Sequence, residues 1–256
     1  MKSKTFLRII FFIAVTSAFN NVLASSDTLA KEKQIYEWRV YTLKGDSKVL
    51  DDFFKDVLIP EYNRQGVSVG VFSPYNEEKD DLRYLLFTYS NLDSYYKATK
   101  NALNNIIHSD NAKSFFEITA TAPAYLSYET YLCEAFDKVP VMLQPEKNRT
   151  LFELRIYHSP NEDAGQRKIN MFNAEEIDLF DKVGIHSVCY GEVLAGLHMP
   201  ALIYLTWHLD ESVRNEAWKK FMSHPDWEKM RNKTEYLNTV TDAKVILLSP
   251  LPYSQL

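Results

Sequence analysis

Two short segments of the sequence carry the same three polar residues, a glutamate, an arginine and a tyrosine, at alternate positions. The segment "IYEWRVY" contains Glu37, Arg39 and Tyr41, and "LFELRIY" repeats the spacing about 116 residues later. Arginine donates paired hydrogen bonds to carboxylates, and a tyrosine hydroxyl donates one more. Such a set can bind a small anionic or polar ligand, or its acid and base can satisfy each other. The second set consists of Glu153, Arg155 and Tyr157.

Both segments are typical of β-strands, in which successive side chains point to opposite faces. We expect the apolar alternate residues, such as Trp38 and Leu154, to face helices, and the Glu-Arg-Tyr residues to face an interior between two sheets. The same reasoning places Leu85, Phe87, Tyr89, Ile203, Leu205 and Trp207 toward helices. It places Tyr84, Tyr204, Thr206 and His208 at the rim of the interior. Because an unpaired buried charge is costly, mutual pairing of the acids and bases is favoured over ligand binding.

The candidate ligand-binding residues are therefore Glu37, Arg39, Tyr41, Glu153, Arg155, Tyr157, Tyr204 and His208. No residue is assigned a catalytic role. We expect Arg155 to lie in the barrel interior, where its loss leaves a carboxylate unpaired at a cost on the order of 3 to 5 kcal/mol.

Other patterns that could do chemistry are scarce. Four histidines lie between residues 186 and 224, but none has the His-x-x-x-His or His-Glu-x-x-His spacing of a metal site, so no metal is expected. No nucleophile elbow, phosphate-binding loop or dinucleotide fingerprint occurs, and no cofactor is expected. Glu175 and Glu176 interrupt an apolar helix face. We expect one of them to reach solvent and the other to cap or pair, with a general base as the alternative.

An internal repeat decides the predicted fold. Each copy begins with a Glu-Arg-Tyr strand and continues through a helix, two strands, a second helix and a last strand. The order β-α-β-β-α-β indicates a ferredoxin-like unit, an antiparallel sheet with helices on one face. Packing the two uncovered faces together gives an α+β barrel or sandwich with pseudo-twofold symmetry within one chain. The predicted units are residues 33–132 and 150–256, joined by a linker at 133–149.

Helix limits in the repeat follow from start signals and spacing. Ser47 is the expected N-cap of the first helix, and Asp210 caps a helix in the second copy. His224-Pro225 is expected to begin another helix, because proline at the first position loses no hydrogen bond.

The first 24 residues resemble a secretory signal peptide, with basic residues, an apolar run from Ile9 to Val15 and the small-residue signal Val22-Leu23-Ala24. The run is shorter than the roughly 20 residues of a spanning helix, so we expect cleavage, export to the periplasm or medium, and no membrane span afterwards. Cleavage removes three positive charges and no negative ones, which takes the net charge from −5 to −8. An acidic chain would be repelled by nucleic acid, so no nucleic-acid partner is expected.

The two cysteines, Cys133 and Cys189, are far apart in the sequence. They could pair in an oxidising compartment, but two cysteines do not make a disulfide framework, and buried free thiols are the favoured alternative.

The second copy resembles the C-terminal domain of the NIPSNAP family. The resemblance rests on "FELRIYHS" at 152–159, "GIHSVCYGEVLAG" at 184–196, "PALIYLTWHLDESVRNEAWKKFMSHPDWEKMR" at 200–231 and "ILLSPLPYS" at 246–254. The first copy is similar but looser, in "YEWRVYTLKGD" at 36–46 and "YLLFTYSNLDSYYKA" at 84–98. The resemblance implies a tandem of NIPSNAP-like units in a dimeric α+β barrel fold. Exported bacterial members have no assigned reaction, while related barrels include cofactor-free monooxygenases and isomerases.

We therefore expect a binding protein for a small molecule or a protein partner that performs no chemistry. The alternative is a cofactor-free enzyme with a pocket near Arg155, Tyr157, Tyr204 and His208. A homo-oligomer is compatible with the sequence beyond the internal pseudo-dimer.

Overall fold

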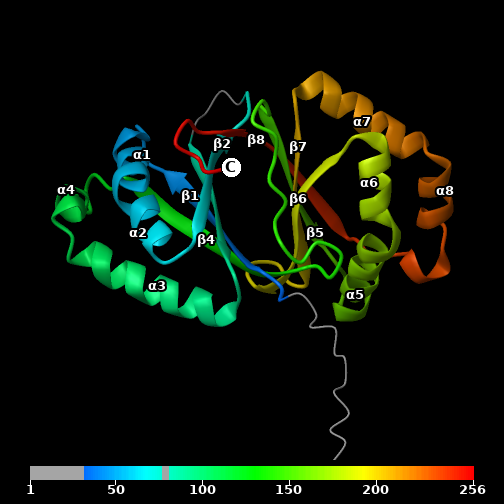
Figure 1. Cartoon of the computed structure of the whole chain (residues 1–256), viewed down its shortest axis with the longest axis horizontal. Helices are drawn as coiled ribbons and strands as arrows, with labels where there is room; N and C mark the ends of the chain where they lie inside the picture. Colours follow the sequence, from blue (N-terminus) through cyan, green and yellow to red (C-terminus); the bar gives the residue numbers. More distant parts are fainter. Residues whose placement is uncertain (1–31, 77–80) are drawn as a thin grey trace, which may run out of the picture. The chain divides into compact units, whose positions relative to one another are not determined.

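The computed structural model describes residues 32–76 and 81–256, which belong to one compact unit. The predicted signal peptide, residues 1–24, lies outside the described residues. Both halves follow the predicted order β-α-β-β-α-β, and the first helix of each half contains one π-helical turn. The architecture is the predicted pseudo-symmetric α+β barrel (Figure 1).

The first half contains four strands, four α-helices, a π-helical turn and a 3₁₀ turn within the described residues. They are β1 (Ile35–Leu43), α1 (Lys48–Phe53), the π turn η1 (Phe54–Leu58), α2 (Ile59–Arg64), β2 (Ser68–Pro74), β3 (Leu82–Tyr89), α3 (Leu92–Ile107), the 3₁₀ turn η2 (Asp110–Ala112), α4 (Lys113–Phe116) and β4 (Tyr125–Ala135). Asn91 caps α3 by accepting a hydrogen bond from the Ser94 backbone N–H. Ser47 occupies the N-cap position of α1 but makes no side-chain capping bond.

The second half repeats this series. It consists of β5 (Leu151–His158), α5 (Glu162–Met171), the π turn η3 (Phe172–Glu176), α6 (Ile177–Val183), β6 (His186–Ala195), β7 (Ala201–His208), α7 (Glu211–Ser223), α8 (Pro225–Arg231), the 3₁₀ turn η4 (Thr234–Tyr236) and β8 (Asp242–Pro250). Asp210 caps α7 and Pro225 opens α8, as predicted. β4 continues three residues into the segment predicted as the linker.

The eight strands form a closed antiparallel barrel in the order β1-β3-β2-β8-β5-β7-β6-β4. Each half supplies four neighbouring strands, and the last strand of one half pairs with the second strand of the other. One seam joins Phe72–Pro74 to Leu248–Pro250, and the other joins Leu132–Ala135 to Gly191–Ala195. The helices cover the outer face of each half's sheet (Figure 1).

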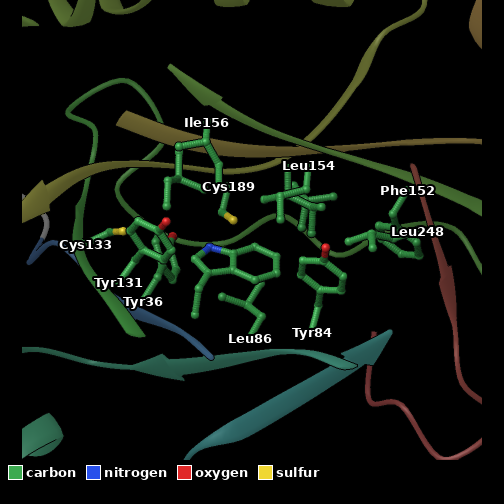
Figure 2. Close-up of a cluster of buried hydrophobic side chains, with 14 of the residues drawn as sticks. Tyr36, Tyr84, Leu86, Tyr131, Cys133, Phe152, Leu154, Ile156, Cys189 and Leu248 are labelled. Carbon is green, nitrogen blue, oxygen red and sulfur yellow. The ribbon is translucent and has the colours of Figure 1, made fainter. Parts of the chain in front are cut away.

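The barrel interior is filled by apolar side chains and not by the Glu-Arg-Tyr residues (Figure 2). Its core includes Tyr36, Trp38, Phe72, Tyr84, Leu86, Tyr131, Cys133, Phe152, Leu154, Ile156, Cys189, Ile203, Leu205, Trp207 and Leu248. The predicted face assignment is therefore wrong for β1, β5 and β7. Glu37, Arg39, Tyr41, Glu153, Arg155, Tyr157, Tyr204, Thr206 and His208 lie on the helix-facing side.

The assignment was right only for β3, where Leu85, Phe87 and Tyr89 pack against helices and Tyr84 lies inside. In β7 the error is a shift of one residue. In the sheet register Glu37 lies opposite Phe87, and its counterpart Glu153 lies opposite Thr206. Phe87 is therefore equivalent to Thr206, which makes Leu82 of β3 equivalent to Ala201 of β7. A slip of one residue moves every side chain of a strand to the other face.

Cys133 and Cys189 are both buried in the barrel and not disulfide-bonded, as predicted. Burial raises the pKa of the Cys133 thiol, and it raises that of Cys189 to about 12. Among residues 32–76 and 81–256, no helix combines the length and apolarity needed to cross a bilayer.

Candidate functional site

The acid and base of the first half form a buried pair between β1 and the covering helices. Arg39 donates from Nε to Glu37 Oε1 at 2.6 Å and from Nη2 to Glu37 Oε2 at 3.1 Å. Nη2 also donates to the Tyr62 hydroxyl at 3.0 Å, and the Tyr89 hydroxyl donates to Glu37 Oε2 at 2.7 Å. The guanidinium carbon lies 4.3 Å from the centre of the Phe87 ring. The pair is therefore charge-neutral and held by partners from α2 and β3.

A cavity of about 210 Å³ lies beside this pair. It is lined by Arg39, Tyr41, Leu50, Phe53, Phe54, Leu58, Tyr62, Thr99, Leu103, Ile106, Phe115, Phe116, Tyr125 and Tyr128. Eight of these fourteen side chains are aromatic, and Arg39 is the one formally charged group among them. Burial raises the pKa of Tyr41, against the opposing effect of the neighbouring Arg39 charge. The cavity is thus an aromatic chamber with a neutralised guanidinium in its wall.

Aromatic contacts hold the wall of the chamber in place. Phe53 stacks on Phe115 with ring centres 3.9 Å apart and an interplanar angle of 11°. Tyr41 stacks on Tyr128 at 4.8 Å. Stacked aromatic pairs stabilise a fold beyond the burial of their surface. These two contacts join α1 to α4 and β1 to β4 around the same space.

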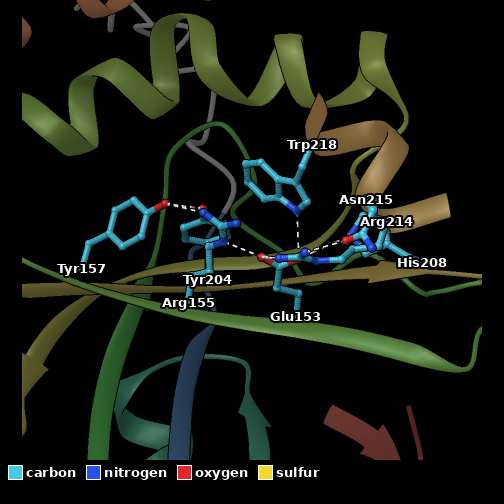
Figure 3. Close-up of polar contacts among 8 residues, drawn as sticks. All are labelled: Glu153, Arg155, Tyr157, Tyr204, His208, Arg214, Asn215 and Trp218. Carbon is cyan, nitrogen blue, oxygen red and sulfur yellow. Dashed lines mark hydrogen bonds and ion pairs between the residues drawn. The ribbon is translucent and has the colours of Figure 1, made fainter. Parts of the chain in front are cut away.

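In the second half, the corresponding acid lies at the centre of a denser network (Figure 3). Glu153 accepts hydrogen bonds from Arg155 Nε at 2.5 Å, from Arg214 Nε at 2.7 Å and Nη2 at 3.1 Å, and from Trp218 Nε1 at 2.8 Å. The Arg155 guanidinium lies 3.6 Å from the centre of the Trp218 ring. Burial alone would raise the pKa of Glu153, but the hydrogen bond from Arg214 and the charges of both arginines hold it below its ordinary value.

The two tyrosines of this half extend the network. Arg155 Nη1 donates to the Tyr157 hydroxyl at 3.0 Å, and the Tyr157 and Tyr204 hydroxyls lie 2.9 Å apart. Burial raises the pKa of Tyr204. The polar atoms of these groups are hydrogen-bonded to one another, as in a buried network that stabilises the fold.

His208 is brought next to this network but does not join it. Its side chain is fully buried, with Nε2 3.9 Å from Glu153 Oε2, and neither ring nitrogen has a hydrogen-bond partner within the described residues. Burial lowers the pKa of His208 to about 4, so its ring is neutral at pH 7. Thr206 Oγ1, on the same strand face, is also buried without a partner among those residues.

Two equivalent helix positions differ in side-chain size between the chamber of the first half and the Glu153 network of the second. Thr99 and Trp218 both stand eight residues after their helix N-caps, Asn91 and Asp210. Trp218 covers Arg155, whereas Thr99 lines the chamber and its Oγ1 is buried without a partner in the described part of the chain. Three residues further along each helix, the first half has a small side chain, Ala102, where the second has Phe221. The two halves share a backbone plan, and their side chains decide whether a cavity exists.

The structure thus divides seven of the eight predicted candidates between two sites, and leaves His208 beside the second without a hydrogen bond to it. Arg39 and Tyr41 line the chamber and Glu37 lies behind Arg39, while Glu153, Arg155, Tyr157 and Tyr204 form the second network. Sequence reasoning missed most of the chamber wall, including Thr99, Leu103, Phe115 and Tyr128. An alignment of the halves from the caps Asn91 and Asp210 would have revealed the Thr99–Trp218 difference.

Glu175 and Glu176 are arranged as expected, with one carboxylate reaching solvent and the other paired. Glu176 is buried and accepts a hydrogen bond from Lys168 at 2.6 Å. Glu175 is partly exposed and pairs with Lys233 and Tyr236. Within residues 32–76 and 81–256, no group of three or more histidine, cysteine or acidic residues converges in a way that could hold a metal ion.

Comparison with known proteins identifies the second half. Residues 152–255 match the model of the NIPSNAP family, so this part of the chain is a NIPSNAP domain. No curated protein matches the chain.

Solved structures show the same fold over most of the chain. A candidate monooxygenase from Lactobacillus acidophilus superposes with a TM-score of 0.57 at 11% identity, covering 86% of this chain and 94% of its own. A candidate monooxygenase from Fusobacterium nucleatum gives 0.55 at 10% identity, with 86% and 93% covered. A NIPSNAP family protein of unknown function from Agrobacterium tumefaciens gives 0.39 at 17% identity, with 44% and 99% covered. At identities this low, the likeness to the first two structures shows the fold alone.

Proposed function

We propose that this chain is an exported tandem of NIPSNAP-like units that binds a small, largely apolar molecule in the chamber of its first half and performs no chemistry on it. The observation that carries the proposal is the chamber itself, a cavity of about 210 Å³ walled by aromatic rings and one guanidinium. Small-molecule sites are concave and mostly apolar, with a few polar groups that fix orientation.

The size and lining of the chamber favour a compact, flat ligand. Its volume is below the roughly 300 to 1,000 Å³ typical of sites for drug-sized molecules, which favours a molecule of one or two rings. Aromatic walls stack on planar ligands in offset or edge arrangements. A one- or two-ring aromatic compound therefore fits the space better than a long flexible chain.

The absence of chemistry is supported by the ionisable groups of the chamber. Among the described residues that line it there is no carboxylate, histidine or cysteine. A general base works best with a pKa near the operating pH, and burial raises the pKa of Tyr41 away from it.

The enzyme alternative has less support. It expected a pocket near Arg155, Tyr157, Tyr204 and His208, yet the first three are hydrogen-bonded within the Glu153 network. Trp218 covers the guanidinium that a substrate would approach.

A matched pair of surface variants tests the proposal. Leu103 lines the chamber and Met222 occupies the equivalent position of α7, twelve residues after the helix N-cap, and both are 57% exposed. A thermal-shift screen of neutral one- and two-ring aromatic compounds, followed by calorimetric titration, should yield a binder. Leu103→Trp should weaken its binding at least about tenfold by obstructing the chamber, and Met222→Trp should leave it unchanged. If no compound in the screen binds, or if both variants bind alike, the chamber is not the site.

A further inference from the structure

We infer that the chamber selects a neutral aromatic molecule carrying one hydroxyl or carbonyl group and discriminates against carboxylates, with Glu37 and Thr99 as the determinants. This inference rests on the proposed function and assigns the ligand class of the same site.

Discrimination against anions follows from the pairing of Arg39. Both oxygens of Glu37 accept hydrogen bonds from its guanidinium, at 2.6 and 3.1 Å, and Glu37 is 3% exposed. The cation in the chamber wall is therefore already neutralised at close range. The described lining contains no lysine, histidine or second arginine. A buried carboxylate needs a cation that is free to pair with it, so a carboxylate ligand would lose its hydration without gaining a counter-charge.

The preference for one polar group follows from Thr99. Its Oγ1 is buried and lacks a hydrogen-bond partner within the described residues, and Thr99 lines the chamber. A threonine hydroxyl can both donate and accept, so it suits a ligand hydroxyl or carbonyl equally. Rotation about the Cα–Cβ bond of Thr99 would bring this hydroxyl to the chamber surface, where a ligand can supply the partner that it lacks in its buried position.

The second half shows what happens when this group is replaced. Trp218, at the position equivalent to Thr99, places its ring on Arg155 and its Nε1 on the carboxylate. The ring and the Nε1 group of Trp218 thus occupy the place beside the paired acid and base that Thr99 has in the first half. Selectivity in the first half therefore depends on a small hydroxyl side chain at residue 99.

Three bicyclic probes of matched shape test the inference at pH 7. These are 2-naphthol, which is neutral and has one hydroxyl, naphthalene, which has none, and 2-naphthoate, which is an anion. By calorimetry or competition, 2-naphthol should bind at least about tenfold more tightly than 2-naphthoate. We expect 2-naphthol to bind about five- to tenfold more tightly than naphthalene, because one net hydrogen bond changes affinity by about this factor.

The variant Thr99→Val keeps the shape of the side chain and removes its hydroxyl. It should lower the affinity for 2-naphthol about five- to tenfold and leave that for naphthalene within about twofold. If none of the probes binds, the proposed function fails. If 2-naphthoate binds as tightly as 2-naphthol, or if Thr99→Val affects both neutral probes equally, the function stands and the assigned ligand class is wrong.

Discussion

Loss of either arginine beside Glu153 should reduce the free energy of unfolding only moderately, whereas loss of both should reduce it by more than the sum of the two single losses. Arg155→Met removes one hydrogen bond to Glu153, one to the Tyr157 hydroxyl and the stacking contact with Trp218, while Arg214 and Trp218 continue to donate to the carboxylate. A hydrogen bond to a charged group contributes about 1.5 to 3 kcal/mol, so we expect a loss of about 2 kcal/mol in the free energy of unfolding. Arg214→Met should cost a similar amount, because Arg155 remains. The earlier expectation of 3 to 5 kcal/mol for loss of Arg155 assumed a single partner.

The double variant leaves Glu153 buried with Trp218 Nε1 as its remaining donor within this network. The carboxyl would then protonate, and moving a group of ordinary pKa near 4.3 to its neutral form at pH 7 costs about 3.7 kcal/mol. The double loss should therefore exceed the sum of the single losses by about 1 to 2 kcal/mol. At pH 5 the protonation cost falls to about 1 kcal/mol, so the excess should nearly vanish.

Urea unfolding of the four proteins at pH 7 and pH 5 measures this coupling, provided that the m-values agree. Lys97→Met, which removes an exposed ion pair with Asp93, is the control and should leave stability nearly unchanged. Additivity of the two arginine losses within about 0.5 kcal/mol at pH 7 would refute the reasoning, because it would mean that neither cation compensates for the loss of the other. An excess equal at both pH values would likewise exclude protonation of Glu153 as its cause.

Two further outcomes follow from the same contacts. The pKa of His208 is lowered from 6.5 to about 4, so the unfolded chain binds more protons than the folded chain between these pH values. The free energy of unfolding should therefore fall by on the order of 3 kcal/mol as the pH drops from 6.5 to 4. In urea unfolding at several pH values, His208→Phe should reduce this pH dependence, and an unchanged dependence would assign it to other groups. Thr99→Trp, which installs the residue found in the second half, should abolish binding of 2-naphthol in calorimetry without lowering Tm, and retained binding would show that the ligand lies elsewhere.

The order of elements was predictable because the repeat, the caps and the apolar spacing all act locally. Asp210 and Pro225 begin their helices as their side-chain chemistry requires. The closed barrel also follows, since two sheets that each expose an apolar face must cover it. Mutual pairing of the acids and bases was also the favoured prediction, and the structure shows it within each strand, as Glu37–Arg39 and Glu153–Arg155.

The side on which these pairs lie was not predictable, because both faces of β1, β3, β5 and β7 are buried. Alternation identifies the solvent side of a half-exposed sheet, but Trp38 and Phe87 are equally buried on opposite faces. What decides the matter is the supply of polar partners from distant segments. Tyr62 reaches Arg39 from α2, and Arg214 reaches Glu153 from α7, 61 residues away in the sequence. The barrel interior, which is lined mainly by strand residues, provides an apolar core and not such polar partners.

The comparison of the two halves bears on whether the chamber is a by-product of folding. The strands, the π-helical turns and the paired acid and base recur in both halves, so the backbone plan alone does not create the space. Interiors pack to the density of organic crystals, and a space left unfilled forfeits dispersion contacts along its whole lining. At two equivalent helix positions the second half has the large side chains Trp218 and Phe221, which pack in its core, while the first retains Thr99 and Ala102. A stabilising alternative is thus available within the same chain and is not used, which is what a space kept for a ligand predicts.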